Sequence, residues 1–398
     1  MAQISDTLSR LSPSATFEMA SKSAELVAQG IDVINLSVGE PDFPTPNHIK
    51  QAAREAIDNN YSKYSPVAGY LALKKAVTAK LGRENGLDYT TSEILISNGA
   101  KQSVCNAIMA LVNPGDEVII PAPFWVSYPQ MVKLAGGTPV HIATSIKSDF
   151  KMSPQQLEEA VSSRTKLLIL CSPCNPSGAV YSKAELQALA DVLLRHPDVF
   201  VISDEIYEHI NYTGESCSIA SLPGMRERTM VVNGVSKAYA MTGWRIGFLA
   251  APEWIVSACS MLQGQYTSGP CSVSQKAAEA AWNGPQDCVA QMCESFRRRR
   301  DLIVRLMRDI PGVEVNEPQG AFYLFPNFEV FIGKNNGGRA IADATDLAMY
   351  LLETGHVATV GGDAFGAPGC LRLSYATSEA NITEAARRIK AALALLTA

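Results

Sequence analysis

The chain has no long hydrophobic run. No uninterrupted apolar stretch in its 398 residues approaches the roughly 18 residues that cross a membrane. The first residues, Met1-Ala-Gln-Ile-Ser-Asp, lack the basic and apolar regions of a secretory signal peptide. A membrane protein is therefore not indicated, and we expect a cytoplasmic protein with no membrane partner.

The chain also lacks the short motifs of several enzyme classes. It has no G-x-G-x-x-G, no G-x-x-x-x-G-K-[ST], no G-x-S-x-G and no H-E-x-x-H, and its five histidines are dispersed. These absences disfavour nicotinamide-dependent, nucleoside triphosphate-dependent, serine hydrolase and zinc protease functions. The net charge of −5 argues against nucleic acid as a partner.

The cysteines do not form a disulfide pattern. There are nine, an odd number scattered along the chain, which favours reduced thiols. One C-x-x-C is present, Cys171-Ser-Pro-Cys174, and this spacing suits a redox pair or half of a zinc site. No second pair at metal-ligand spacing accompanies it, so we expect no metal.

The middle of the chain alternates apolar runs with helical patterns. Strands are predicted at residues 92–97, 117–121, 166–171, 199–203 and 229–232, with helices between most of them. Continuous Val, Ile and Leu runs separated by helices are typical of strands buried on both faces. The sequence therefore predicts an α/β fold with a mostly parallel sheet sandwiched by helices, and ligands at the carboxyl ends of its strands.

The two ends of the chain have a different pattern. Helices near 14–29, 286–308 and from 378 onward, with short strands at 321–325 and 371–374, indicate a smaller α+β unit. We predict an N-terminal arm at 1–14, a small domain made of 15–46 and 296–398, and a large domain at 47–295.

One lysine lies in a loop rich in small residues. Lys237 follows the apolar run at 229–232, within Asn233-Gly-Val-Ser-Lys237, and Arg245 comes eight residues later. A lysine can form a Schiff base, and a nearby arginine can hold a phosphate. Pyridoxal 5′-phosphate (PLP) is anchored by its aldehyde and its phosphate, so it needs both groups. A solvated loop lysine is the alternative for Lys237 taken alone.

Two further side chains follow the predicted strand at 199–203. Asp204 could pair with the protonated pyridine nitrogen of PLP, which keeps the ring positive and electron-withdrawing. Tyr207 could reach the phenolic oxygen of the ring. The alternatives are a helix N-cap for Asp204 and a packing role for Tyr207.

A strand-to-helix turn at Ser97-Asn-Gly-Ala-Lys101 suits an anion. Gly99, Ala100 and the following backbone N–H groups, with the helix dipole, would favour phosphate, and Lys101 adds charge for the phosphate or for a distal substrate carboxylate. Trp125 offers an indole that could stack on a flat ring, although a single tryptophan is more often part of a core.

An asparagine and an arginine complete the set of candidates. Asn175, in the tight loop 172–178, could donate to the ring oxygen or serve only the turn. Arg372 lies mid-strand among apolar neighbours, and a buried arginine needs an anionic partner. Its planar fork matches a carboxylate, such as the α-carboxylate of an amino acid.

These residues belong to a series of motifs that is similar to a known family. The chain resembles the class I aminotransferases of PLP fold type I, specifically the aspartate aminotransferase branch common in bacteria. The motifs come in family order over nearly the whole chain. They are Pro13-Ser-Ala-Thr16, Val38-Gly-Glu-Pro-Asp-Phe43, Tyr64-Ser-Pro-Val-Ala-Gly69, Asn113-Pro-Gly-Asp-Glu-Val118, Pro123-Phe-Trp-Val-Ser-Tyr-Pro129, Ser172-Pro-Cys-Asn-Pro-Ser-Gly178, Ser203-Asp-Glu-Ile-Tyr-Glu-His209, the run around Lys237, and Arg372-Leu-Ser-Tyr-Ala-Thr377.

The resemblance implies a role for each matching residue. Lys237 would hold PLP as an internal aldimine and then act as the acid and base, and the large domain 47–295 would bind the cofactor. The other implied roles are ring-nitrogen pairing by Asp204, ring-oxygen contacts by Asn175 and Tyr207, stacking by Trp125, phosphate binding by Arg245, Gly99, Ala100, Lys101 and Ser236, and substrate binding by Gly39, Trp125, Asn175 and Arg372.

The resemblance also implies a homodimer with shared active sites, in which Tyr64 reaches the phosphate bound by the partner subunit. The expected reaction is transamination between L-aspartate and 2-oxoglutarate. Preference for an acidic side chain rests on Lys101, Ser14 and Thr16, so aromatic, alanine, methionine or prephenate/arogenate donors stay open, as does a C–S lyase.

Two positions depart from the family pattern. Close relatives often carry lysine just before Pro-Ser-Ala-Thr, where this chain has Ser12. In the family that lysine is tied to prephenate, so a prephenate activity is in doubt. Cys174 replaces a frequent asparagine, and we expect little effect on the chemistry because Asn175 is retained.

Overall fold

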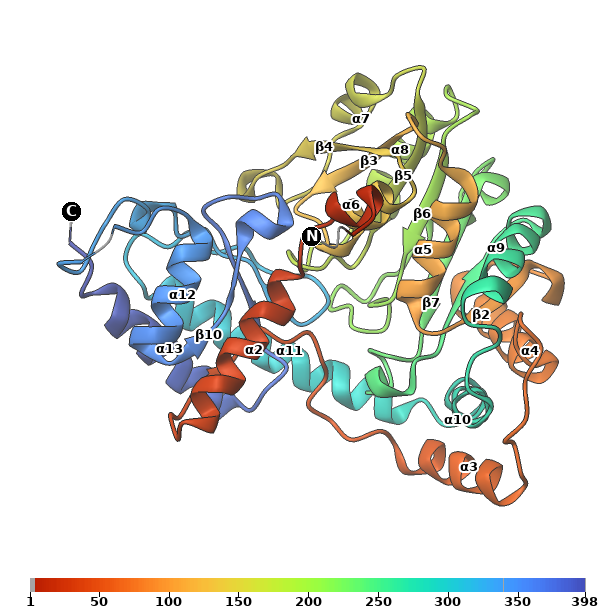
Figure 1. The fold of residues 1–398 in the computed structure, drawn as a ribbon, viewed down its shortest axis with the longest axis horizontal. Helices are drawn as coiled ribbons and strands as arrows, with labels where there is room; N and C mark the ends of the chain where they lie inside the picture. Colours follow the sequence, from red (N-terminus) through yellow and green to blue (C-terminus); the bar gives the residue numbers. More distant parts are fainter. Residues whose placement is uncertain (1–3, 339, 398) are drawn as a thin grey trace.

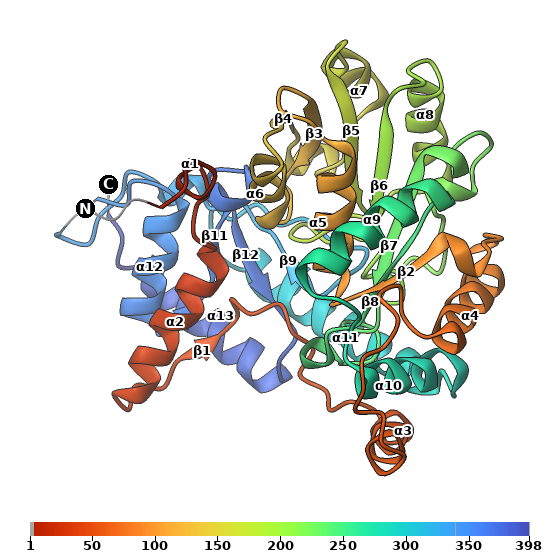
Figure 2. The ribbon, with the colours of Figure 1, turned by 45° about the vertical axis from the view of Figure 1, so that its right-hand side comes forward.

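A seven-stranded β-sheet forms the centre of the molecule in the computed structural model, which describes residues 4–338 and 340–397. The strand order is β2-β8-β7-β6-β5-β3-β4 (Figure 1; β8 is labelled in Figure 2). The pairs from β7 to β4 are parallel, whereas β8 is antiparallel to β2 and β7. The mostly parallel sheet is therefore confirmed. The strands are β2 (Ile94–Ser97), β3 (Glu117–Ala122), β4 (Thr138–Ala143), β5 (Thr165–Cys171), β6 (Phe200–Asp204), β7 (Thr229–Gly234) and β8 (Gly247–Ala250).

Helices cover both faces of this sheet, because its apolar strands are buried on both sides. In β5, Leu167 and Ile169 face one hydrophobic cluster, and Leu168 and Leu170 face another. The first face is covered by α5 (Ala100–Leu111), α6 (Ser127–Leu134) and α9 (Glu253–Tyr266). The second is covered by α4 (Leu71–Lys80), α7 (Pro154–Ala160), α8 (Lys183–Leu193) and α10 (Ser272–Asn283).

The N-terminus of α8 is fixed by a local sequence motif. Ser182 accepts a hydrogen bond from the backbone N–H of Glu185, and the Glu185 carboxylate accepts one from the N–H of Ser182. This reciprocal capping box satisfies two N–H groups that the helix itself leaves unpaired.

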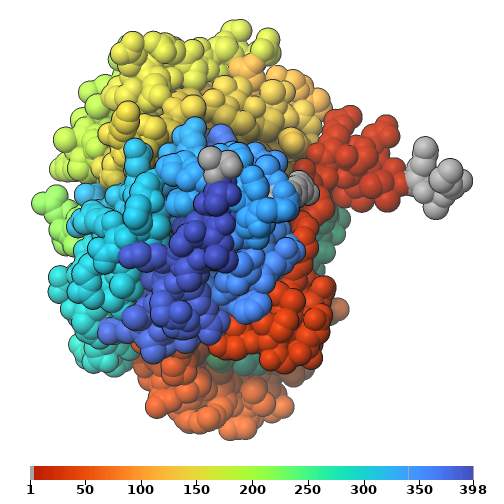
Figure 3. Space-filling model, turned by 90° about the vertical axis from the view of Figure 1, so that its left-hand side faces the viewer, coloured from red at the N-terminus to blue at the C-terminus, as the bar shows by residue number. Residues whose placement is uncertain are grey.

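The two ends of the chain build a second, smaller unit together. Strand β1 (Ile34–Asn35) pairs in parallel with β10 (Val357–Ala358), and β12 (Leu371–Ser374) lies between β9 (Tyr323–Leu324) and β11 (Val360–Gly361), antiparallel to both. Figure 3 shows the N-terminal segment lying directly against C-terminal segments, and Figure 2 shows α2 beside α12 and α13. The helices of this unit are α2 (Ala15–Ala28), α12 (Ala344–Gly355) and α13 (Glu379–Leu393).

One long helix, α11 (Asp287–Arg308), connects the two units without a break. Val289 packs into a core of the large unit, whereas Met292, Phe296 and Ile303 pack into the core of the small one. The boundary predicted between 295 and 296 therefore falls inside a single helix. Of the segments predicted as domains, residues 1–3, 339 and 398 lie outside the described residues.

The remaining elements are short or peripheral. Helix α1 (Asp6–Ser9) contacts α6, and α3 (Asn47–Asp58) packs against α10. Helical turns occur at Leu81–Asn85, Thr91–Glu93, Ile146–Ser148, Ile219–Ser221, Arg226–Arg228, Thr242–Trp244, Glu329–Phe331 and Gly362–Phe365. Across 4–338 and 340–397, every helix is too short or too polar to traverse a lipid bilayer.

Candidate active site

The carboxyl ends of three neighbouring strands carry the side chains of the site. Asn175 follows β5, Asp204 ends β6, and Lys237 follows β7. Since these strands are parallel neighbours in the sheet, their ends meet at one edge. The small unit contributes Arg372 from β12, and Arg372 donates a hydrogen bond to Asn175. The structure thus joins residues that lie up to 197 positions apart in the sequence.

The ε-amine of Lys237 is held without a carboxylate. It donates a 2.6 Å hydrogen bond to the backbone oxygen of Gly39 and lies 5.8 Å from the ring centre of Tyr207. No carboxylate of the described residues is within ion-pair distance. Burial lowers the pKa of Lys237 from 10.5 to about 8, and the nearby cations Arg372 and Arg245 act in the same direction. The ammonium still predominates at neutral pH, and the free amine becomes the major form above about 8.

Asp204 is buried and takes a hydrogen bond from a tyrosine that sequence reasoning missed. The Tyr128 hydroxyl donates to Asp204 Oδ2 over 2.6 Å, and the N–H of Ile206 donates to Oδ1 over 3.3 Å. Burial raises the pKa of Asp204, and these two donors oppose the rise. No α-helix starts after Asp204, so the N-cap alternative is wrong. Tyr128 comes from α6, 76 positions before Asp204, so no local pattern in the sequence indicates this contact.

A turn of small residues and an arginine form a cradle for an anion. Gly99 precedes α5 with φ of 80°, a left-handed conformation that favours glycine. A Cβ at Gly99 would collide with the guanidinium of Arg245, and one at Gly247 would collide with the backbone N–H of Ala100. Arg245 donates only to backbone oxygens among the described residues, those of Thr242 and Asn98. The cradle joins a helix N-terminus to a cation that has no carboxylate partner among residues 4–338 and 340–397.

Lys101 lies beside this cradle and over an aromatic ring. Its Nζ is 5.0 Å from the ring centre of Trp125. Loss of surrounding water lowers the pKa of Lys101, and Arg245 adds to the effect. Trp125 is half-buried and meets Tyr128 edge to face, with ring centres 5.3 Å apart. An indole face and a second cation therefore border the same edge of the sheet.

Arg372 is 2% exposed and has unused hydrogen-bonding capacity. Its Nη1 donates to Asn175 Oδ1 over 3.0 Å and its Nη2 to the backbone oxygen of Ser37 over 2.6 Å, whereas its Nε has no partner. The guanidinium lies between the rings of Tyr323 and Phe365, 4.7 and 5.0 Å from their centres. No carboxylate of the described residues pairs with it, so the charge is available to an anionic ligand.

Tyr207 lies under Lys237 and contacts another tyrosine that the sequence did not reveal. The hydroxyls of Tyr207 and Tyr323 are 2.8 Å apart, and both side chains are buried. Burial holds the pKa of both phenols above the ordinary value. Both tyrosines are therefore neutral hydrogen-bonding groups at neutral pH.

The segment that carries Gly39 is tied to both units. On one side, Thr242 bonds Glu40, and Thr45 donates to the backbone oxygen of Ala240 over 2.7 Å. On the other, the guanidinium of Arg299 in α11 donates hydrogen bonds to both carboxylate oxygens of Asp42, at 2.7 and 3.0 Å.

The other predicted residues lie at varied distances from this cluster. Ser236 is buried next to Lys237, and Ser14 and Thr16 are half-buried at the start of α2. Tyr64 is 98% exposed, beside a surface groove that includes Tyr61 and Pro270. Among the described residues Tyr64 has no hydrogen bond to the site, so a single chain does not bring it there.

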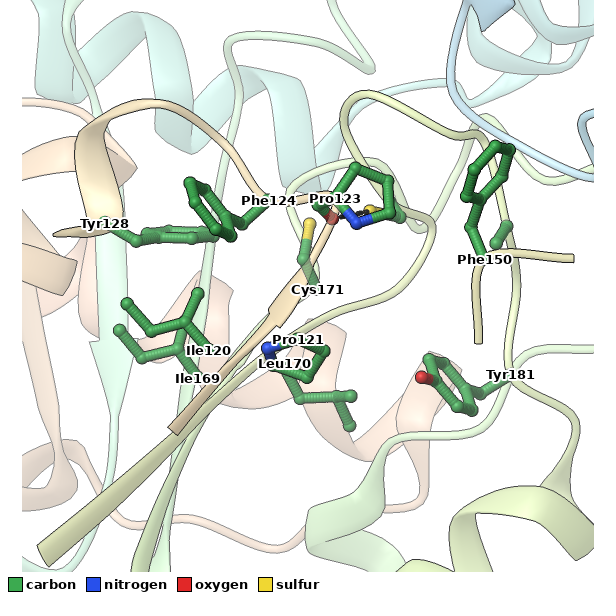
Figure 4. Close-up of a pocket in the computed structure, with 12 residues that line it drawn as sticks. Ile120, Pro121, Pro123, Phe124, Tyr128, Phe150, Ile169, Leu170, Cys171 and Tyr181 are labelled. Atoms are coloured by element: carbon green, nitrogen blue, oxygen red, sulfur yellow. Dashed lines mark hydrogen bonds between the residues drawn. The ribbon is translucent and has the colours of Figure 1, made fainter. Parts of the chain in front are cut away.

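A small cavity lies next to Tyr128, the residue that bonds Asp204. It has a volume of about 20 Å³, and Figure 4 shows Tyr128 and Cys171 in its wall. That volume suits about one water molecule, too little for a cofactor or substrate. Cys171 and Cys174 are free thiols, and no metal-ligand cluster formed by the described residues includes either.

Comparison with known proteins gives a consistent assignment. The family model described as aminotransferase class I and II matches residues 31–389. The chain is 49% identical over 394 residues to an aspartate/prephenate aminotransferase of Cereibacter sphaeroides, with 98% of each chain covered. It is 47% identical to an aspartate aminotransferase of Rhizobium meliloti, covering 98% of this chain and 96% of the relative.

Solved structures agree with this assignment. The aspartate aminotransferase of Rhizobium meliloti superposes with a TM-score of 0.96 at 46% identity and full coverage of both chains. The aspartate aminotransferase of Thermus thermophilus with maleate has a TM-score of 0.92 at 40% identity, covering 98% of this chain and all of that one. The chain therefore belongs to the class I and II aminotransferases, enzymes whose cofactor is pyridoxal 5′-phosphate.

Proposed function

We propose that this aminotransferase transfers the amino group of L-aspartate to 2-oxoglutarate. The observation that carries the proposal is the buried Arg372, which has no carboxylate partner in the described chain, donates to Asn175 and Ser37, and is close enough to Lys237 to help lower the pKa of its amine. The similar proteins of known name support the choice of aspartate, because several are aspartate aminotransferases. The Thermus thermophilus relative was studied with maleate, a dicarboxylate of the same length as aspartate.

The residues of the site fit pyridoxal phosphate. The cradle of Gly99, Ala100 and Arg245 suits the phosphate, with Lys101 and the buried Ser236 beside it. Asp204 suits the protonated ring nitrogen, because a positive partner offsets the cost of a buried carboxylate. Asn175 and Tyr207 would be the hydrogen-bonding partners of the ring oxygen, and the indole of Trp125 would stack on the ring. When bound, pyridoxal phosphate withdraws electrons from the α-carbon of an amino acid and carries its amino group between the two substrates.

Lys237 is the catalytic residue in this proposal. Its amine is released from Gly39, holds the cofactor, and later moves the proton at the substrate α-carbon. A pKa of about 8 suits both tasks, because each requires a free amine and an ammonium to interconvert near neutral pH. The backbone of Gly39 then lies over the substrate.

Two cations each bind one carboxylate of the substrate in this proposal. Arg372 takes the α-carboxylate with its fork, supported by Asn175. Lys101, over the ring of Trp125, takes the distal carboxylate, and Ser14 and Thr16 are the further side chains assigned to it in this proposal. A dicarboxylate satisfies both cations, whereas an aromatic or alanine donor leaves Lys101 without its partner. Ser12 replaces the lysine that the family ties to prephenate and supplies no third cation, so prephenate, which the name of the Cereibacter sphaeroides relative includes, stands as the alternative to aspartate in this proposal.

The active enzyme is a cytoplasmic homodimer in this proposal. Tyr64 is nearly fully exposed, next to the exposed side chains of Ile57 and Tyr61. Large exposed apolar side chains that gather in one groove are typical of an interface. A second copy covering this groove brings Tyr64 to the phosphate of the partner subunit.

Spectroscopy and a donor panel test the proposal. The purified protein should show a visible absorption band that borohydride abolishes and that Lys237→Ala lacks. With 2-oxoglutarate as acceptor, L-aspartate should give a higher kcat/KM than phenylalanine, alanine or methionine. A wild-type protein without the band would refute the assignment of Lys237. A preference for an uncharged donor would refute the substrate, and pyruvate with ammonia as products would indicate a lyase.

A further inference from the structure

A buried cluster of charges lies outside the residues that face the substrate. Lys80, the last residue of α4, is 1% exposed. Its ammonium donates to the carboxylate of Glu208 and, over 2.7 Å, to the side-chain oxygen of Asn85. The side-chain N–H of Asn85 in turn donates to Glu208 Oε2 over 2.8 Å. Burial favours the neutral form of Glu208, but Lys80, His209 and Asn85 together outweigh it, and the pKa of Glu208 stays below the ordinary value.

The cluster carries its own cation. Glu84, Glu208 and His209 place one ligand atom each within 4.8 Å of one another, a spacing that a metal ion would also suit. However, the ammonium of Lys80 already bonds Glu208 and lies 3.6 Å from Glu84. The cluster is therefore an internal ion pair network rather than a metal site.

The network reaches the loop that carries Lys237. Glu208 Oε1 also accepts a 2.7 Å hydrogen bond from the side chain of Asn233, which is 2% exposed. The other end of that side chain accepts the backbone N–H of Gly234 over 2.7 Å. Gly234 is the last residue of β7, three positions before Lys237. Its Cα faces the backbone at Gly247 so closely that a Cβ would collide there, so the loop leaves the strand at a fixed point.

The same carboxylate belongs to the turn that carries Tyr207. Glu208 is the next residue in the chain, and the Tyr207 ring lies 5.8 Å from the amine of Lys237. The far side of Tyr207 is held by the hydroxyl of Tyr323. One carboxylate thus joins the two segments whose side chains face each other across the site.

We propose that Glu208, clamped by Lys80, is a positioning residue that fixes Lys237 relative to Tyr207 through its hydrogen bond to Asn233. The inference rests on the proposed roles of Lys237 and Tyr207. We call the chain of hydrogen bonds Lys80–Glu208–Asn233 the bridge. A variant that breaks the bridge should change the pH titration of Lys237, although none of these three residues contacts the substrate in the proposed function.

The first test is Asn233→Ala in the holoenzyme, which cuts the bridge and leaves the Lys80–Glu208 pair intact. Asn106→Ala is the matched control, since Asn106 is a buried amide on α5 that bonds only Gln263 among the described residues. Two readouts are needed: the pH titration of the lysine–cofactor absorbance, and kcat/KM for L-aspartate. We expect Asn233→Ala to move the titration midpoint by about half a unit or more and to lower kcat/KM by about tenfold to a hundredfold. Asn106→Ala should leave both unchanged at a similar loss of Tm.

The second test compares Glu208→Gln with Glu208→Ala. Glutamine keeps an oxygen that can accept from Asn233 and Lys80, and Glu84 remains within 3.6 Å to balance the ammonium. The midpoint should therefore return toward the wild-type value in Glu208→Gln and stay displaced in Glu208→Ala.

The outcomes separate this inference from the proposed function. A wild-type enzyme without a titratable lysine–cofactor band would overturn the assignment of Lys237 and the positioning role with it. If the wild type shows the band, but Asn233→Ala and Asn106→Ala behave alike, only the positioning role is wrong. Equal effects of glutamine and alanine at position 208 would also overturn that role.

Discussion

The hydroxyl of Tyr128, on α6, donates a 2.6 Å hydrogen bond to the buried carboxylate of Asp204 at the end of β6. This donor opposes the effect of burial, which raises the pKa of Asp204. The charge of Asp204 therefore depends partly on a residue outside the proposed substrate contacts.

Tyr128→Phe should weaken cofactor binding. The variant keeps the ring but removes the donor, so the carboxylate form of Asp204 loses about 1.5–3 kcal/mol of stabilisation, as expected for a hydrogen bond to a charged group. We expect the Kd for pyridoxal phosphate, measured by absorbance titration, to rise by about tenfold or more. Tyr181→Phe is the matched control, because its buried hydroxyl accepts from the N–H of Met152 instead. Equal Kd values for the two variants would contradict the prediction.

The uptake of cofactor by the apoenzyme should depend on pH through Lys237. The lowered pKa, about 8, means that the amine is protonated below that pH and free above it. After removal of pyridoxal phosphate, the rate at which the visible band reappears should rise as pH increases through about 8 and then level off. Lys237→Arg should not form the band at any pH. A midpoint near 10.5 in the wild type would show that burial does not depress this amine.

Arg372→Lys should lower kcat/KM equally for every amino donor. Lysine keeps the charge but loses the planar fork and the simultaneous bonds to Asn175 and Ser37. We expect kcat/KM to fall by about a hundredfold or more for L-aspartate and for phenylalanine. The measurement is a steady-state donor series at fixed 2-oxoglutarate. A loss confined to acidic donors would mean that Arg372 binds the distal carboxylate instead.

Lys101→Ala should lower kcat/KM for acidic amino donors more than for aromatic ones. Removal of the Lys101 ammonium leaves a distal carboxylate without its cation, whereas an aromatic donor loses little. We expect the ratio of kcat/KM for L-aspartate to that for phenylalanine to fall by about tenfold or more. Lys166→Ala is the control, since the Lys166 ammonium also lies over a ring, that of Phe200, at 5.1 Å. Equal losses for both donors with Lys101→Ala would place Lys101 at the phosphate alone.

The sequence predicts the strands of the sheet and the site residues at their ends, but it does not predict which side chains of the site contact one another. Apolar runs mark β5, β6 and β7, so Asn175, Asp204 and Lys237 are assigned to strand ends by the sequence alone. Strands β4 and β8 are missing from the predicted set. The first is a largely unburied edge strand without a continuous apolar run, and the second is only four residues long and closely follows Arg245 in a polar motif.

Contacts between distant segments could not be predicted. Tyr128 lies 76 positions from Asp204, and Tyr323 lies 116 positions from Tyr207, so no local spacing links either pair. Tyr323 belongs to a short apolar run that indicates only a strand. The partner of such a hydroxyl depends on how the two units pack, which local patterns do not encode.

The continuity of α11 has a mechanical consequence. Because the helix is packed into two cores at once, any rotation of the small unit would have to turn the helix about its end near Val289, which is anchored in the large unit. Arg299 lies along that helix and bonds Asp42, three residues from the backbone oxygen that holds the amine of Lys237. A rotation of the small unit would therefore shift Asp42 and, through the short segment to Gly39, the oxygen that accepts from the amine of Lys237.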